Sequence, residues 1–218
     1  SRLWRRDSTH HRKPYLFYNE SMKVMKEYEQ NIKWMGILKE ALEYDRIIPY
    51  FQPIMNNKTG KISKFECLAR LQGKEGNTYS PFFFLDISKR SKLYHKITSA
   101  IITKSFQAFE NSPYSFSINL SLEDILYPTT TKFIKDMLVR YDNAQNVVFE
   151  ILESEGIENY ELVASFIGEV KELGSRVAID DFGSGYSNFA HILKLDVDYI
   201  KIDASIIREA DKDKNSQI

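Results

Sequence analysis

The chain has 218 residues, of which 43% are hydrophobic and 28% charged, a composition typical of a globular protein with one substantial core. Lys and Arg total 30, as do Asp and Glu, so the zero net charge gives no support for a nucleic-acid polymer as partner. No stretch is apolar for long enough to span a membrane, and no signal peptide is evident. The single cysteine, Cys67, excludes an internal disulfide and favours a reducing, cytoplasmic setting, which is compatible with a membrane-anchored parent protein.

The N-terminal part predicts a connecting segment followed by one long helix. Residues 1–20 are polar and irregular. From Ser21 to Tyr44, apolar residues recur at spacings of mostly three and four, which predicts a helix with one apolar face. These residues are Met25, Tyr28, Ile32, Met35, Leu38 and Leu42. Packing against the adjacent domain is the simpler interpretation of this face, and a signalling helix or coiled-coil dimer is the alternative.

The rest of the chain predicts an α/β fold. Ile47–Ile54 and Ile62–Leu71 are strand-like and flank a turn signal at residues 56–60, which predicts an antiparallel hairpin. Beyond the hairpin, helical and strand patterns alternate, and this order predicts a parallel sheet with right-handed crossovers. The mostly helical stretches are Pro81–Phe109, Leu122–Tyr141, Asn159–Leu173 and Asn188–Leu195, and the strands are Tyr114–Leu120, Asn146–Leu152, Arg176–Ile179 and Tyr199–Ile202.

Polar side chains gather at the ends of these strands. Asp180 and Asp181 follow the apolar run Val177–Ile179, and burial of two adjacent carboxylates is costly unless a cation compensates for it. The other strands contribute Glu66, Asn119, Glu150 and Lys201. Each residue alone is more often a solvated edge residue, but the strand ends of a parallel β/α barrel face one mouth where catalytic groups lie. The set therefore predicts a site for divalent metal ions, an arrangement that serves phosphoester hydrolysis.

Six motifs stand in order along the chain. They are Tyr50-Phe51-Gln52-Pro53-Ile54, Phe65-Glu66-Cys67-Leu68-Ala69-Arg70, Ile118-Asn119-Leu120-Ser121, Phe149-Glu150-Ile151-Leu152-Glu153, Asp180-Asp181-Phe182-Gly183-Ser184-Gly185-Tyr186-Ser187 and Val197-Asp198-Tyr199-Ile200-Lys201-Ile202-Asp203. With these motifs the chain resembles the EAL domain, the bacterial hydrolase of the second messenger cyclic di-GMP. The resemblance implies an EAL domain over residues 34–218, built as a TIM-like (β/α) barrel with one antiparallel strand. Residues 1–33 resemble a linker or signalling helix that leaves an upstream domain, often a GGDEF domain.

The resemblance also implies a metal centre and its catalytic residues. Glu66, Asn119, Glu150 and Asp180 would hold a first Mg²⁺ or Mn²⁺, and Asp180 would bridge to a second ion held by Asp181. Lys201 would orient the attacking water or help to deprotonate it. Lys201 and Glu66 are therefore the expected catalytic residues.

Further residues are implied to bind substrate or to regulate the site. Cyclic di-GMP would contact Gln52, Leu68, Arg70 and Asp203, with Arg70 at a phosphate. A loop made of Phe182, Gly183, Ser184, Gly185, Tyr186 and Ser187, helped by Glu153, would couple the second metal to formation of a homodimer.

The sequence departs from the family pattern at some points. Cys67 stands where alanine is usual, and Ser88-Lys89 stands where Ala-Glu is usual, which removes an acid near the mouth. The family continues with two βα units that supply another metal-binding glutamate and a glutamine. Neither unit is present here, so we expect an incomplete domain with six strands where a closed barrel has eight.

Three functions are compatible with this pattern. A metal-dependent phosphodiesterase that opens cyclic di-GMP to linear pGpG is favoured, because a scaffold needs neither the acids nor Lys201. The absent units favour instead a catalytically impaired domain, which would bind cyclic di-GMP without cleaving it or would bind protein partners only.

Overall fold

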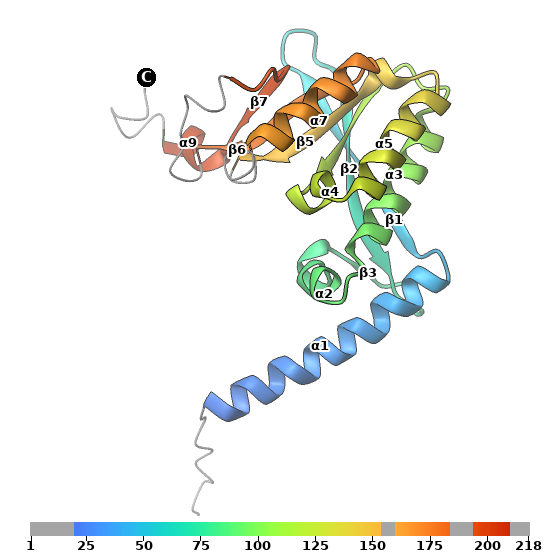
Figure 1. Cartoon of the computed structure of the whole chain (residues 1–218). Helices are drawn as coiled ribbons and strands as arrows, with labels where there is room; N and C mark the ends of the chain where they lie inside the picture. Colours follow the sequence, from blue (N-terminus) through green and yellow to red (C-terminus); the bar gives the residue numbers. More distant parts are fainter. Residues whose placement is uncertain (1–19, 154–159, 184–193, 210–218) are drawn as a thin grey trace, which may run out of the picture.

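The computed structural model describes residues 20–153, 160–183 and 194–209, and its centre is a β-sheet (Figure 1). The main path of the sheet runs β1-β2-β4-β5-β6-β7. Strand β1 pairs antiparallel with β2, and each later pair on this path is parallel. The bounds are β1 Ile47–Asn56, β2 Lys61–Gln72, β4 Ser115–Leu120, β5 Val147–Leu152, β6 Arg176–Phe182 and β7 Tyr199–Ile202, with the short β3 Thr78–Tyr79 on β2. Among the described strands, β1 and β7 form the two edges, so the sheet is not closed.

Helices cover one face of the sheet. Helices α3 (Tyr94–Phe109) and α7 (Tyr160–Glu172) pack on it, and α5 (Pro128–Arg140) lies between them (Figure 1). The shorter helices are η1 Pro81–Phe83, α2 Leu85–Arg90, α4 Leu122–Leu126, η2 Ala144–Asn146 and α9 Ala204–Glu209. The hairpin and the alternation of helices with parallel strands confirm the α/β fold predicted from the sequence.

Two stretches predicted as mostly helical are each divided into shorter helices. The first is interrupted at residues 91–93, where Lys92 has a φ of 58°, a left-handed conformation that ends a helix. The second is interrupted before Pro128, because proline disfavours the helical conformation of the residue before it, and Tyr127 is extended. Strand β3 and helix α9 were not predicted. The predicted helix Asn188–Leu195 lies outside the described residues except for residues 194–195, which are not helical.

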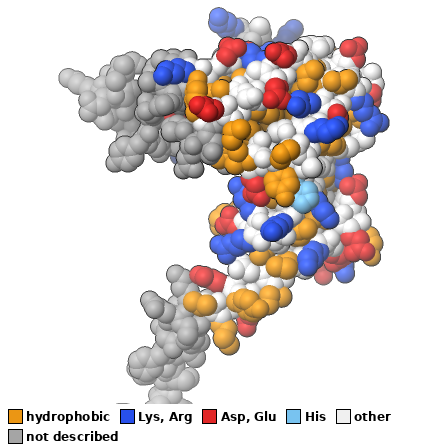
Figure 2. Space-filling view, viewed as in Figure 1, with side chains coloured by type: hydrophobic (Ala, Val, Ile, Leu, Met, Phe, Trp, Pro, Cys, Tyr) orange, Lys and Arg blue, Asp and Glu red, His pale blue; other side chains and the backbone are white. Residues whose placement is uncertain are grey.

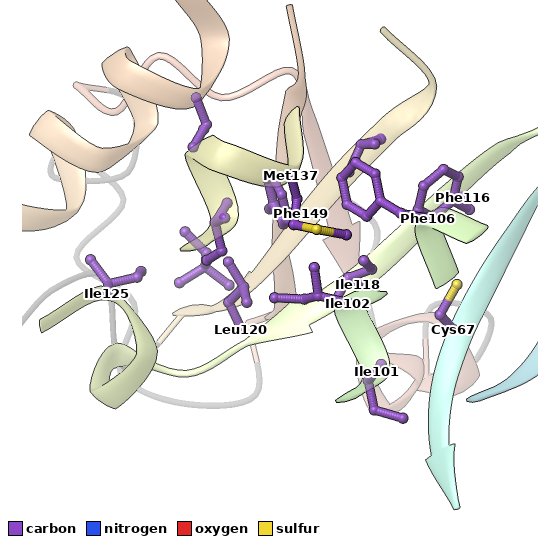
Figure 3. Close-up of a cluster of buried hydrophobic side chains, with 14 of the residues drawn as sticks. Cys67, Ile101, Ile102, Phe106, Phe116, Ile118, Leu120, Ile125, Met137 and Phe149 are labelled. Carbon is purple, nitrogen blue, oxygen red and sulfur yellow. The ribbon is translucent and has the colours of Figure 1, made fainter. Parts of the chain in front are cut away.

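Alternation along the strands separates a core face from a polar face. In β4, Phe116, Ile118 and Leu120 are buried, and they point toward the helices because alternate residues share one face of a strand. The same alternation places Phe149 of β5 in this cluster, to which Met137 of α5 also belongs (Figure 3). The opposite face of the sheet is therefore left for the polar residues that alternate with this core.

The long helix α1 (Glu20–Glu43) packs over only part of its length. Near its C-terminal end Leu38 is fully buried, and the Trp34 ring lies 5.0 Å from the Tyr79 ring, so this part packs on the domain as the simpler interpretation predicted. Nearer the N-terminus, apolar side chains remain 54–67% exposed along the projecting helix (Figure 2). They are Val24, Met25, Tyr28 and Ile32. Within the described ranges, no helix combines the length and the apolar character needed to cross a membrane.

Removal of a core ring should test this packing. Phe149 is fully buried and its ring lies 6.2 Å from that of Phe166, so we expect Phe149→Ala to lower the free energy of unfolding by about 3–5 kcal/mol. Urea denaturation measures the change. The control is Val139→Ala on α5, which is 73% exposed and should change stability by no more than about 0.5 kcal/mol. Similar stabilities for the two variants would contradict the assigned core.

Cys67 should be chemically inert in the folded protein. Burial raises the pKa of its thiol to about 12, and only 3% of the residue is exposed. Because the thiolate is the reactive form, we expect a chromogenic disulfide reagent at pH 8 to modify the native protein at least about 100-fold more slowly than the unfolded protein. Equal rates in buffer and in guanidinium chloride would show that Cys67 is accessible.

Candidate metal centre

Three strands bring three carboxylates together on the polar face of the sheet. Glu66 of β2, Glu150 of β5 and Asp180 of β6 each offer an oxygen atom, and these atoms lie within 4.8 Å of one another. The Glu150 side chain is fully buried, whereas those of Glu66 and Asp180 are 18% and 17% exposed. Parallel pairing places Asn119 of β4 opposite Glu150. The Asn119 side chain also reaches the cluster, since its Nδ2 donates to Glu66 Oε1 at 2.9 Å.

The chemistry of this donor set fits a hard divalent cation. Carboxylate and amide oxygens are the ligands that Mg²⁺ and Mn²⁺ prefer. The three carboxylates also require a positive charge nearby. Their negative charges are close together and partly shielded from water, so they repel one another strongly. Glu66, Asn119, Glu150 and Asp180 are thus suited by chemistry and by position to hold one cation.

Lys201 of β7 supplies positive charge to the acid cluster. Its Nζ lies 2.6 Å from Glu150 Oε2, 2.9 Å from Asp180 Oδ2 and 3.7 Å from Glu66 Oε2. Burial alone would lower the pKa of Lys201, but hydrogen bonds to Glu150 and Asp180 outweigh it and raise this pKa above its usual value. Lys201 is therefore an ammonium at the centre of the acid cluster.

A β-bulge places Asp180 and Asp181 together. The register between β6 and β7 shifts so that these two residues stand opposite Lys201 alone, and Asp181 has a φ of 55°. In a regular strand they would point to opposite faces, but here both line the same cavity. Asp181 is exposed and lies outside the three-carboxylate group. Partial desolvation and the charge of Asp180 raise the pKa of Asp181.

The acids open into a cavity of about 340 Å³. Glu66, Asn119 and Asp180 line it, together with apolar side chains that include Leu68 and Leu152. Lys89 also lines the cavity, with its ammonium 5.1 Å from the centre of the Tyr94 ring. The departure from the family pattern at Ser88-Lys89 therefore places a cation beside the cavity, while Ser88 itself is buried.

The residues predicted to bind substrate are placed in different surroundings. Leu68 lines the cavity, whereas Gln52, Arg70 and Asp203 do not. Gln52 is exposed on β1, opposite Glu66 in the antiparallel register. The Arg70 guanidinium donates to Ala69 O at 2.8 Å and lies 5.6 Å from the centre of the Tyr50 ring.

Asp203 is engaged at the start of a helix. It accepts hydrogen bonds from the Ser205 backbone N–H at 2.7 Å and from the Ser205 hydroxyl, which lower the pKa of Asp203. These are the contacts of an N-terminal cap on α9.

The predicted regulatory loop is described only at its first two residues, Phe182 and Gly183, and residues 184–187 lie outside the described part. The buried Glu153 is close to this loop, since its Oε2 accepts from the Gly183 N–H at 2.8 Å. Gly183 has a φ of 89°, and a Cβ there would lie 2.1 Å from Ile206 Cδ1. The positive φ favours glycine at this position, and any other residue would also have to displace the end of the Ile206 side chain.

The sequence analysis missed Lys64. Its Nζ lies 3.1 Å from Glu150 Oε1, so this lysine belongs to the acid cluster. The signal that could have identified it is strand alternation: Lys64 precedes Glu66 by two residues in β2 and therefore shares its face.

Comparison with known proteins identifies the family. The EAL domain matches residues 35–218 of the chain. The chain belongs to the EAL domain family. This EAL chain is 31% identical over 189 residues to the probable cyclic di-GMP phosphodiesterase PdeG of Escherichia coli, covering 83% of the chain and 37% of PdeG. It is 30% identical over 191 residues to the cyclic di-GMP phosphodiesterase PdeB of Shewanella oneidensis, covering 83% of the chain and 22% of PdeB.

A solved structure confirms the fold. The EAL domain of FimX from Pseudomonas aeruginosa, bound to c-di-GMP, matches with a TM-score of 0.76 and 24% identity, covering 84% of this chain and 76% of that one. The fold is thus that of the EAL domain, the TIM-like barrel that was predicted. The chain spans well under half the length of the two curated relatives, PdeG and PdeB.

Removal of the central ammonium should destabilise the ligand-free site. Lys201→Met leaves the three carboxylates without their shared partner. Because the Lys201 side chain is 29% exposed, we expect the free energy of unfolding to fall by only about 1–3 kcal/mol at pH 7 in EDTA. Because the Lys201 pKa is raised on folding, its stabilisation is present throughout neutral pH and is lost only above about pH 10.

The pH dependence separates this effect from a loss of packing. In Lys201→Met, lowering the pH toward 5 should recover part of the lost stability, because a carboxyl can take up a proton in place of the ammonium. Thermal melting at pH 5, 7 and 8 measures this. A deficit that does not change with pH would mean that Lys201 acts through packing rather than charge.

Proposed function

We propose that this chain is the EAL part of a metal-dependent phosphodiesterase that hydrolyses cyclic di-GMP to linear pGpG in bacterial signalling. The observation that carries the proposal is the convergence of Glu66, Glu150 and Asp180 within 4.8 Å beside Lys201. Membership of the EAL family and the activities named for PdeG and PdeB support the substrate.

Metal ions would be held by the residues that the cluster brings together. Glu66, Asn119, Glu150 and Asp180 would hold the first Mg²⁺ or Mn²⁺, and Asp180 and Asp181 would hold the second. When bound, such ions activate water and neutralise charge on phosphoryl oxygens.

The protein's own side chains would position the reactants. Lys201 is an ammonium among the carboxylates, so it can donate hydrogen bonds that orient a water molecule or a phosphoryl oxygen. Leu68 and Leu152 form part of an apolar wall against which a guanine base could pack. Arg70 and Gln52 would contact the dinucleotide beyond this cavity, as would Asp203, with Arg70 at a phosphate.

The rest of the chain fits a signalling protein. Residues 34–218 would form the EAL domain, and residues 1–33 would connect it to an upstream GGDEF or sensory domain. The exposed apolar side chains of α1 support a role for this segment in signalling between domains or subunits. The loop that begins at Phe182 and Gly183 would link the second metal to a homodimer, in a cytoplasmic setting.

A catalytically impaired cyclic di-GMP-binding domain is the second candidate. One observation favours it: Lys64 and Lys201 each contact an oxygen of Glu150, so a metal ion at this carboxylate would have to compete with two ammonium groups. Such a domain would bind the dinucleotide and release no product.

Chromatography of cyclic di-GMP incubated with the protein and Mg²⁺ or Mn²⁺ tests the proposal. We expect pGpG to form, and Lys201→Ala to cut turnover by roughly 100-fold or more while leaving ligand affinity nearly intact. Arg70→Ala is the control, because a contact made to the ground state should mainly weaken binding. Ca²⁺ should support binding but little turnover, since it prefers longer bonds and more ligands.

The outcomes distinguish the candidates. Binding of cyclic di-GMP without pGpG in either metal would favour the impaired domain, and absence of both binding and hydrolysis would contradict the proposal. Equal losses of affinity in Lys201→Ala and Arg70→Ala would remove Lys201 from the catalytic residues.

A further inference from the structure

Glu150 is bound by a second ammonium that the proposed mechanism does not use. Lys64 Nζ lies 3.1 Å from Glu150 Oε1, while Lys201 Nζ lies 2.6 Å from Oε2. The Glu150 side chain is fully buried, and only 18% of the Lys64 side chain is exposed. Each oxygen of this carboxylate therefore faces its own cation, so Glu150 has no oxygen without a positively charged partner.

Lys64 is held beneath the acids by its neighbours. It pairs with Ser115 in the register of β2 and β4, two residues toward the amino end of β2 from Glu66. Its Nζ lies 5.9 Å from the centre of the Tyr199 ring on β7, a distance that allows a cation–π contact. The Tyr199 hydroxyl accepts from Arg176 Nη1 at 2.7 Å, which fixes the ring. The Lys64 ammonium, from β2, thus lies between Glu150 of β5 and the Tyr199 ring of β7.

We propose that Lys64 is a positioning residue that holds Glu150 in the ligand-free site and weakens the affinity of that site for divalent cations. The inference rests on the proposed function, because it concerns the same metal centre. A metal ion that takes Glu150 must draw a carboxylate oxygen away from an ammonium. It must also approach a fixed positive charge in surroundings that screen it poorly. Lys64 thereby keeps the acid cluster stable without metal and makes occupancy depend on metal concentration.

Titration of Mn²⁺ into metal-free protein, followed by electron paramagnetic resonance, tests this without substrate. We expect Lys64→Met to bind Mn²⁺ about tenfold or more tightly than the wild type, because the charge is removed while the unbranched side chain is shortened by only one atom. The matched control is Lys61→Met, an exposed lysine at the start of the same strand, and it should bind as the wild type does. Lys64→Gln is measured alongside, so that the comparison stands if the methionine variant does not fold.

The melting temperature of the Lys64 variants in EDTA supplies a second test. Lys64→Met should melt a few degrees below the wild type and recover when Mn²⁺ is added, because the buried carboxylate has lost one partner. In a Glu150→Gln background the same substitution should cause little or no further decrease, since the charge that Lys64 contacts is gone. An equal decrease in both backgrounds would overturn a role through Glu150.

The Mn²⁺ titration separates this proposal from the metal centre itself. Equal or weaker binding by the Lys64 variants, with clear binding by the wild type, would overturn the role of Lys64 and leave the metal centre standing. No Mn²⁺ binding by the wild type or by any Lys64 variant would contradict the metal centre and the role of Lys64 with it.

Discussion

The site depends on one constraint: the carboxylate of Glu150 is fully buried and must have cations beside it. Transfer of an unpaired carboxylate out of water costs several kcal/mol even after the protein relaxes. The structure meets this cost with Lys201 from β7 and Lys64 from β2, strands that lie on either side of Glu150 in the sheet. Both lysines reach Glu150 because the register from β2 through β5 to β7 places their side chains on the same face of the sheet as this carboxylate. The electrostatics of the site and the order of the strands are therefore two aspects of one arrangement.

The same sheet keeps packing and chemistry apart. Residues such as Phe116 and Phe149 face the helices and form the core, while the residues beside them in sequence, Ser117 and Glu150, face the other side. The bulge at Asp180 and Asp181 is the local exception, since it places two adjacent acids beside one cavity. The same strands therefore carry the core on one face and the acids on the other.

Much of this arrangement could be predicted from the sequence. The hairpin, the parallel strands and the gathering of Glu66, Asn119, Glu150, Asp180 and Lys201 follow from apolar patterns and from the resemblance to the EAL domain. The break before Pro128 also had a local signal, whereas the bulge at Asp181 depends on how β6 and β7 pair, which no local pattern specifies. Lys64 was missed because a lysine in a strand is usually a solvated residue. Strand alternation places it on the same face as Glu66, but its contact with Glu150 depends on how the strands pair.

The central claim is that the acid cluster is a divalent-cation site at which two lysines compete with the metal ion for Glu150. Anomalous diffraction from crystals of the protein soaked in Mn²⁺ tests this claim most directly. The account predicts an anomalous peak within bonding distance of Glu66, Glu150 and Asp180, with the Lys201 ammonium moved away from Glu150 Oε2. A map without a peak at these carboxylates, with both lysines still bound to Glu150 at millimolar Mn²⁺, would contradict it.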